Sequence, residues 1–340
     1  MATNDIKKLT FKDFKSDQEV RWCAGCGDFA ILNTVHKAMA TLGLPKEKYA
    51  LISGIGCSSR FPYYMNTYAF HGIHGRALAI ASGLKSSKPE LSVWVITGDG
   101  DGLAIGGNHF IHTIRRNINM NVLLFNNEIY GLTKGQYSPT TKEGFVTKTS
   151  PFGTIEHPFN PGELVLGANG HFFARSIDSN IKLTHDILIN AEAHKGTSVV
   201  EILQNCVIFN DKTHSYYTDK EHKLDRQLVL KHGEKMIFGK NNDKGLMLDG
   251  MKLKVVTIGE NGVTEDDLIT HDAHEESPFL HWMLINMKGP DYPIALGVIR
   301  SVSGTVYEEK MAQQIEDQKA KSKILSMNDL LHSGATWTVD

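Results

Sequence analysis

Short apolar runs alternate along the chain with segments of helical period, and this alternation constrains the fold more than any other feature. Between Phe29 and Leu42, apolar residues recur every three or four positions, which predicts a helix that Gly43 ends. A strand-like run follows over residues 49–53 and breaks into a glycine-rich loop. Strands that alternate with helices form βαβ units, so we predict an α/β fold with a doubly wound, mostly parallel sheet.

The same alternation continues to about residue 210. It predicts further strands over residues 93–97, 122–125, 172–177 and 198–203, and helices over residues 76–85, up to about 116, and 181–194. Residues 127–161 are irregular and rich in Gly and Pro, and a loop of this length is usually functional. Beyond residue 212 the chain is more charged, with one strand candidate at 252–258 and helices over 279–287 and 308–323. We therefore expect a domain over residues 1–210 and a C-terminal extension over residues 211–340, packed on the core and on a partner subunit.

The composition is that of a globular protein and excludes several classes of function. Lys and Arg number 36 against 38 Asp and Glu, so the chain has no basic field for nucleic acid or anionic lipid. No apolar run approaches the roughly 18 residues of a membrane span, and the polar N-terminal segment lacks the apolar core of a signal peptide. We expect a cytoplasmic protein whose partners are small molecules or other proteins.

Two polar loops follow neighbouring strands of the predicted sheet. Residues 98–101 read Gly-Asp-Gly-Asp, and Asn126-Asn127 ends the next strand, so both loops should meet at one edge of the sheet. The glycines allow backbone amides to approach a diphosphate, while Asp99, Asn127 and the carbonyl of Ile129 offer oxygen ligands to a divalent cation. Taken alone, each motif could also be an ordinary turn or strand end.

The four cysteines are too few for a disulfide scaffold of this size. Cys23 and Cys26 form a Cys-x-x-Cys motif before the first helix, and Cys57 and Cys206 follow strands. Four thiolates on loops of one layered fold could bind a structural zinc ion, act as a redox pair or hold an iron–sulfur cluster. The spacing alone favours zinc or no metal.

The two polar loops together resemble the thiamine diphosphate signature of enzymes that use this cofactor. In those enzymes the aspartate, the second asparagine and a carbonyl two residues later hold Mg²⁺, which corresponds here to Asp99, Asn127 and Ile129. An oxidative reaction on this cofactor must remove two electrons, and the sequence has no dinucleotide fingerprint to accept them as hydride. An adjacent cluster can accept them singly.

With the cysteines included, residues 22–210 resemble the β subunit of the 2-oxoacid:ferredoxin oxidoreductases, most closely the 2-oxoglutarate type. The resemblance is carried by Trp22-Cys-Ala-Gly-Cys-Gly-Asp28, Gly54-Ile-Gly-Cys-Ser-Ser-Arg60, His71-Gly-Ile-His-Gly-Arg76, Gly98-Asp-Gly-Asp101 and Asn126-Asn-Glu-Ile-Tyr-Gly-Leu-Thr-Lys-Gly-Gln136. It implies one [4Fe–4S] cluster on Cys23, Cys26, Cys57 and Cys206, next to thiamine diphosphate and Mg²⁺.

The resemblance also implies which residues surround the cofactor. They are Ile55, Gly56, Cys57, Ser58, His74, Gly98, Asp99, Gly100, Asp101, Asn127, Gly131 and Leu132. We further expect His71, Arg76 and Lys134 to meet a substrate carboxylate or coenzyme A. Helix capping or simple exposure to solvent would equally explain these three side chains.

The implied activity is the coenzyme A-dependent oxidative decarboxylation of 2-oxoglutarate to succinyl-CoA and CO₂, or its reverse, with electrons passing through the cluster to ferredoxin. Pyruvate or a branched-chain 2-oxoacid is the alternative substrate, and a non-catalytic Zn-Cys₄ protein is a remote alternative. The carboxylate that activates the cofactor is expected on an α subunit with the pyrimidine-binding domain, in an (αβ)₂ assembly.

Overall fold

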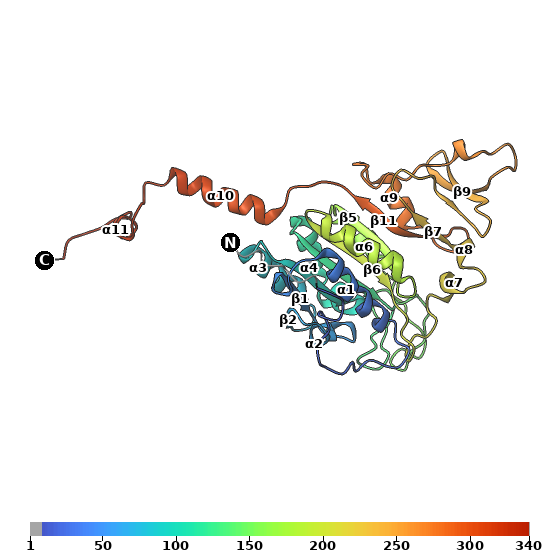
Figure 1. The fold of residues 1–340 in the computed structure, drawn as a ribbon, viewed down its shortest axis with the longest axis horizontal. Helices are drawn as coiled ribbons and strands as arrows, with labels where there is room; N and C mark the ends of the chain where they lie inside the picture. Colours follow the sequence, from blue (N-terminus) through green and yellow to red (C-terminus); the bar gives the residue numbers. More distant parts are fainter. Residues whose placement is uncertain (1–8, 340) are drawn as a thin grey trace.

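The computed structural model describes residues 9–339, and their centre is an eight-stranded sheet in the order β2-β1-β3-β4-β6-β5-β11-β7 (Figure 1). The strands are β1 (Tyr49–Ser53), β2 (Tyr68–His71), β3 (Ser92–Gly98), β4 (Met120–Asn126), β5 (Phe172–Ile177), β6 (Thr197–Leu203), β7 (Gln227–Leu230) and β11 (Ile294–Ser301). Strands β1 to β6 are parallel, and β11 runs antiparallel to β5. The predicted α/β fold with a mostly parallel sheet is confirmed.

Helices cover both faces of this sheet, so each central strand contributes to two hydrophobic cores. On β3, Trp94 belongs to the core beneath α1 (Asp28–Leu42) and α6 (Ile181–Ala193), whereas Val95 belongs to the opposite core. The helices of that opposite face are α3 (Ala77–Ser87), α4 (Gly107–Arg116), α5 (Pro161–Gly167) and α9 (Phe279–Ile285). Burial on both faces explains why the central strands read as continuous apolar runs in the sequence.

Short elements connect the larger ones. They are α2 (Phe61–Tyr64), α7 (Ser215–Thr218), α8 (Lys223–Arg226), the 3₁₀ turns Lys46–Lys48, Ser58–Arg60 and Glu265–Asp267, and a π-helical turn over Asp101–Ile105 that leads into α4. Helix α1 ends as predicted at Gly43, whose φ of 72° lies in the left-handed region that glycine adopts readily.

The part beyond residue 210 differs from its prediction. A single strand was predicted there, but the segment contains β8 (Ile237–Phe238), β9 (Lys244–Asp249) and β10 (Lys252–Thr257) as a small antiparallel sheet. It also supplies β7 and β11 to the main sheet, so the sheet continues beyond residue 210, to which the alternation in the sequence had been followed. Pairing between β5 and β11 joins segments far apart in sequence, which local patterns do not reveal.

The chain leaves the body of the fold in a C-terminal arm, composed of α10 (Tyr307–Lys321) and α11 (Met327–Leu331) (Figure 1). In α10 only Glu308 is buried, and its carboxylate accepts hydrogen bonds from the backbone N–H of Asn119. Among the helices of residues 9–339, none combines the length and the apolar character that crossing a bilayer requires.

A buried histidine in α1 makes the stability of the fold depend on pH. His36 is 2% exposed, and its Nε2 lies 3.2 Å from the carbonyl oxygen of Tyr64. Burial lowers the pKa of His36 from 6.5 to about 4. Between these values the unfolded chain binds a proton that the folded chain does not, so the free energy of unfolding falls as the pH falls from 6.5 toward 4.

We therefore expect the His36→Gln variant to lose less stability over this pH range than the parent chain, by up to about 3 kcal/mol. Urea unfolding at a series of pH values measures the difference, and His157→Gln, at an exposed position, is the matched control. Identical pH slopes for the parent and His36→Gln would contradict the assignment.

Candidate functional site

The loops that follow β1, β2, β3 and β4 enclose a cavity of about 490 Å³ at the carboxyl edge of the sheet. Its lining contains every residue that the sequence predicted to contact the cofactor: Ile55, Gly56, Cys57, Ser58, His74, Gly98, Asp99, Gly100, Asp101, Asn127, Gly131 and Leu132. Ile129 and Tyr130 also line it. The structure thus brings together residues from loops that are distant in sequence.

The buried carboxylate of Asp101 ties these loops to one another. Its Oδ1 accepts hydrogen bonds from the backbone N–H of Ile55 (3.0 Å) and of Gly75 (2.7 Å), and lies 2.7 Å from Nδ1 of His74. Its Oδ2 accepts from the hydroxyl of Thr97 at 2.8 Å. Because its oxygens are occupied by protein donors, Asp101 shapes the cavity by positioning the loops around it.

Asp99 is the carboxylate next to Asp101 in this loop, and it is 2% exposed. Its Oδ2 accepts hydrogen bonds from the hydroxyls of Ser138 (2.6 Å) and Thr140 (2.5 Å). Burial raises the pKa of Asp99 to about 6, against these hydrogen bonds, which lower it. A cation at this carboxylate would favour its ionised form.

The turn after β4 presents oxygen atoms to the same cavity. Glu128 has a φ of 56°, and the backbone N–H of Ile129 donates to Oδ1 of Asn127 at 3.2 Å. Asn210 Nδ2 donates to the backbone carbonyl of Asn127 at 3.0 Å and thereby fixes the turn from outside. The irregular backbone predicted after this strand is what brings Asn127 and Ile129 to one wall.

The site fits a bound diphosphate with a divalent cation. A Cβ on Gly100 would lie 2.2 Å from the ring of Tyr130, whose hydroxyl donates to the Gly100 carbonyl at 2.9 Å, so only glycine allows this close packing. The oxygen donors available are a carboxylate on Asp99, a side-chain amide on Asn127 and a backbone carbonyl on Ile129. Such hard oxygen ligands suit Mg²⁺.

The cysteines lie against the same cavity. Cys57 Sγ and Cys206 Sγ are each 3.5 Å from the position that a Cβ on Gly131 would take, and Gly131 itself lines the cavity. Burial raises the pKa of Cys57 to about 12, with further increases from Asp28, Cys206 and Cys23. The pKa of Cys26 is likewise raised, first by burial and then by Asp28, with smaller contributions from Cys206 and Cys57.

The loop of Cys23 and Cys26 also lies beside the segments of the other two cysteines. The indole Nε1 of Trp22 donates to the backbone carbonyl of Cys57 at 2.6 Å, and a Cβ on Gly25 would lie 3.6 Å from Val207. Within residues 9–339, no three His, Cys, Asp or Glu side chains converge tightly enough to hold one metal ion. All four cysteines are free thiols, and Cys23 is exposed whereas the other three are half-buried. As donors, four free thiols on loops fit an iron–sulfur cluster, in which each iron binds one thiolate.

Three of the predicted side chains do not line the cavity: His71, Arg76 and Lys134. The ring of His71 packs edge-on against Tyr63 at 5.3 Å between centroids, and Arg76 contacts His109. Lys134 is exposed on the loop after β4.

Sequence reasoning missed two side chains that support the cavity through Asp99, namely Ser138 and Thr140. Both belong to the irregular segment after β4, whose length was the one available signal. Neither lies in a motif that distinguished it from solvent-exposed loop residues. Tyr130 was part of a quoted motif, but no role at the cavity was predicted for it.

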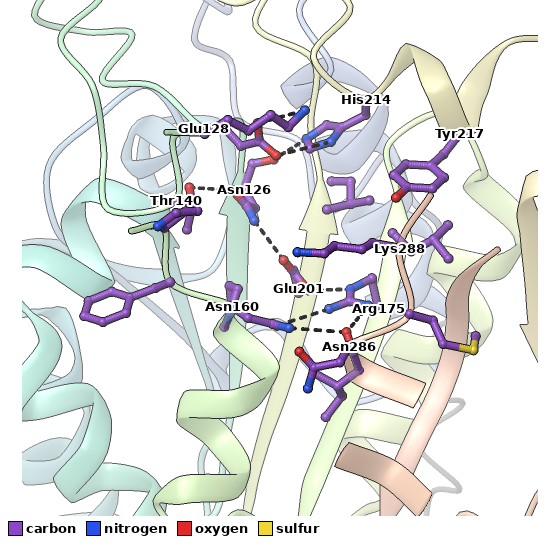
Figure 2. A pocket seen from close by; sticks show the side chains of 18 of the residues that line it. Asn126, Glu128, Thr140, Asn160, Arg175, Glu201, His214, Tyr217, Asn286 and Lys288 are labelled. Atoms are coloured by element: carbon purple, nitrogen blue, oxygen red, sulfur yellow. Dashed lines mark hydrogen bonds and ion pairs between the residues drawn. The ribbon is translucent and has the colours of Figure 1, made fainter. Parts of the chain in front are cut away.

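A second cavity, of about 610 Å³, has Asn126 and Thr140 in its lining (Figure 2). It contains the buried ion pair between Arg175 and Glu201, which are 2.6 Å apart. Asn126 Nδ2 donates to Glu201 at 2.8 Å, and Asn126 Oδ1 accepts from Thr140 at 3.0 Å. Since Thr140 also contacts Asp99, a buried polar network connects the two cavities.

Comparison with known proteins agrees with this geometry. Residues 54–202 match the family model described as the C-terminal TPP-binding domain of thiamine pyrophosphate enzymes. The chain is 48% identical over 332 residues to the 2-oxoglutarate oxidoreductase subunit KorB of Mycobacterium tuberculosis, covering 97% of this chain and 88% of that protein. It is 41% identical over 216 residues to a β subunit of a 2-oxoacid:ferredoxin oxidoreductase from Aeropyrum pernix, covering 63% and 70%.

A solved structure shares the whole fold. It is the 2-oxoglutarate:ferredoxin oxidoreductase from Magnetococcus marinus with 2-oxoglutarate, coenzyme A and succinyl-CoA bound, which superposes with a TM-score of 0.78 at 31% identity over 98% of both chains. By this likeness, and by the identity that extends along nearly its full length, the chain belongs to the β subunits of the 2-oxoacid:ferredoxin oxidoreductases and contains their thiamine diphosphate-binding domain.

Proposed function

We propose that the chain is the β subunit of a 2-oxoglutarate:ferredoxin oxidoreductase. The reaction converts 2-oxoglutarate, coenzyme A and two oxidised ferredoxins into succinyl-CoA, CO₂, a proton and two reduced ferredoxins, or runs in reverse. The observation that carries the proposal is the contact between the two candidate centres, because Gly131 lines the cofactor cavity and adjoins the sulfurs of Cys57 and Cys206. The substrate assignment draws on the relative from Mycobacterium tuberculosis.

Within this proposal, Asp99, Asn127 and the Ile129 carbonyl bind Mg²⁺, which neutralises the diphosphate. Backbone groups of Gly98 and Gly100 surround that diphosphate. Thiamine diphosphate, when bound, supplies the nucleophilic carbon and the electron sink that decarboxylation of a 2-oxoacid requires. The protein side chains position this cofactor and exclude water from it.

His74 adds a polar side chain to the lining of the cavity. Its Nδ1 lies 2.7 Å from Asp101 Oδ1, which fixes the orientation of the ring. A carboxylate partner on one ring nitrogen leaves Nε2 to face the diphosphate or the substrate. The remaining predicted contacts, His71, Arg76 and Lys134, are proposed to act in the assembled enzyme, where a partner chain completes the site.

The cluster in this proposal is a [4Fe–4S] centre on Cys23, Cys26, Cys57 and Cys206. Its place beside the cavity lets electrons leave the cofactor one at a time, and external ferredoxin then carries them away. Because Cys23 is exposed, the side of the cluster that it binds lies near the surface, where ferredoxin can approach and accept electrons.

An α subunit with the pyrimidine-binding domain and an (αβ)₂ assembly complete the proposal. Support comes from the outer edge of the main sheet, where β2 is exposed along most of its length. Tyr68 (65% exposed) and Phe70 (53%) project from it, next to Tyr63 (51%) and Ile73 (68%). An unpaired strand edge with large apolar side chains is a typical protein-binding surface.

The test is an anaerobic assay of the co-expressed α and β chains against a panel of 2-oxoacids, with coenzyme A and ferredoxin. We expect succinyl-CoA formation and ferredoxin reduction together, with the highest kcat/KM for 2-oxoglutarate, and no turnover by the β chain alone. Preference for pyruvate or a branched-chain 2-oxoacid would replace the substrate assignment. Turnover by the β chain, with mass spectrometry excluding the α chain, would contradict the shared site.

Two variants separate the two centres. Asp99→Asn should weaken thiamine diphosphate binding at limiting Mg²⁺ by about tenfold or more, because a charged ligand of the cation is lost. The iron content of this variant should stay unchanged.

Cys57→Ser should lose iron and the broad visible absorption of the cluster, because a ligand of the cluster is lost. Its affinity for thiamine diphosphate should stay unchanged.

Calorimetric titration with the cofactor and chemical analysis of iron and sulfide measure these two properties. A Cys57→Ser protein with full iron content would remove that cysteine from the ligand set. Unchanged cofactor affinity in Asp99→Asn would remove the aspartate from the cation site.

A further inference from the structure

We propose that Gln204 is a positioning residue that connects the two centres, orienting Asn127 toward the cation and donating a hydrogen bond to the cluster ligand Cys26. The proposal rests on the proposed function, since it assigns Asn127 and Cys26 to those centres. Gln204 follows β6 directly and is 1% exposed. It was not among the residues predicted from the sequence.

The side-chain amide of Gln204 touches both centres at once. Its Nε2 donates to Cys26 Sγ at 3.2 Å and to the backbone carbonyl of Asn205 at 2.7 Å. Its Oε1 accepts from Nδ2 of Asn127 at 2.8 Å. The backbone of the same residue is also fixed, because its N–H donates to the carbonyl of Asn126 at 2.9 Å.

These contacts determine which way both amides face. A primary amide has two hydrogens on nitrogen, and those of Gln204 match two acceptors, Cys26 and Asn205. Rotation of this amide by half a turn would oppose its nitrogen to the nitrogen of Asn127 and leave both acceptors without a donor. A buried amide in such a network is therefore held in one orientation.

The orientation matters at Asn127 because a cation binds oxygen and not amide nitrogen. Since Gln204 accepts from Nδ2 of Asn127, the oxygen of Asn127 is turned to the other side, where Ile129 donates to it. Asn127 and Ile129 both line the cofactor cavity. Gln204 thus presents the correct atom of Asn127 to the cation, as outer-shell partners do in metal sites.

At Cys26 the same amide stabilises negative charge on the cluster. A hydrogen bond to a ligand sulfur stabilises the more negative, reduced state of an iron–sulfur cluster and raises its reduction potential. The Gln204 donor, 3.2 Å from Cys26 Sγ, acts in this direction and favours the acceptance of electrons by the proposed cluster.

Two substitutions test the two ends of the amide in the anaerobically purified αβ complex. Gln204→Met keeps the length of the side chain but removes both the donor and the acceptor. Gln204→Glu keeps an acceptor for Asn127 and removes the donor to Cys26. The control is Gln227→Met, a half-buried glutamine that donates to Tyr217 and touches neither centre.

We expect the midpoint potential of the cluster, titrated by electron paramagnetic resonance without thiamine diphosphate, to shift downward in both Gln204 variants. Affinity for thiamine diphosphate at limiting Mg²⁺ should fall about tenfold in Gln204→Met and much less in Gln204→Glu. Gln227→Met should match the parent complex in both measurements. If Gln204→Met loses iron, the Gln204→Glu complex still reports both quantities.

An unchanged potential in a Gln204 variant with full iron content would overturn the donor role. Equal cofactor affinity in the parent, Gln204→Met and Gln204→Glu would overturn the orientation of Asn127. The parent complex is measured first, because an absence of iron or of cofactor binding there would contradict the proposed function and not the role of Gln204.

Discussion

The buried carboxylate of Asp101 is the interaction on which the architecture of the site depends. It accepts from the backbone of the loops after β1 and β2 and from Thr97 on β3. A carboxylate removed from water without such donors would cost several kcal/mol, whereas hydrogen bonds to a charged acceptor stabilise by about 1.5–3 kcal/mol each. Because two of the donors are backbone amides, satisfying the charge also fixes the course of both loops.

The part of the lining around Asn127 is held by side-chain amides, where the loops around Asp101 are held by a carboxylate. Asn210 holds the carbonyl of Asn127, Gln204 holds its side chain, and both come from the segment around Cys206. A change in the backbone around the cysteines would therefore displace a wall of the cofactor cavity. The two candidate centres share their supporting residues, which explains why one segment after β6 contributes to each.

The sequence predicted the features that depend on local pattern. The strands β1, β3, β4, β5 and β6 were expected within a few residues of their bounds, because burial on both faces makes them continuous apolar runs. Edge strand β2 was missed because its residues are mostly exposed. The role of Gln204 could not be predicted from local sequence patterns, because its partners Asn127 and Cys26 lie 77 and 178 positions away along the chain.

The C-terminal arm has a consequence for the energetics of the free chain. Helix α10 is 15 residues long and packs against the body only at its first turn, through Glu308, so little tertiary burial supports it. A helix of this length is marginal in water without such burial. Leu325 and Trp337, farther along the arm, are 87% and 83% exposed. With so little burial, the arm adds almost nothing to the stability of the fold, while its extension away from the body enlarges the hydrodynamic radius of the chain.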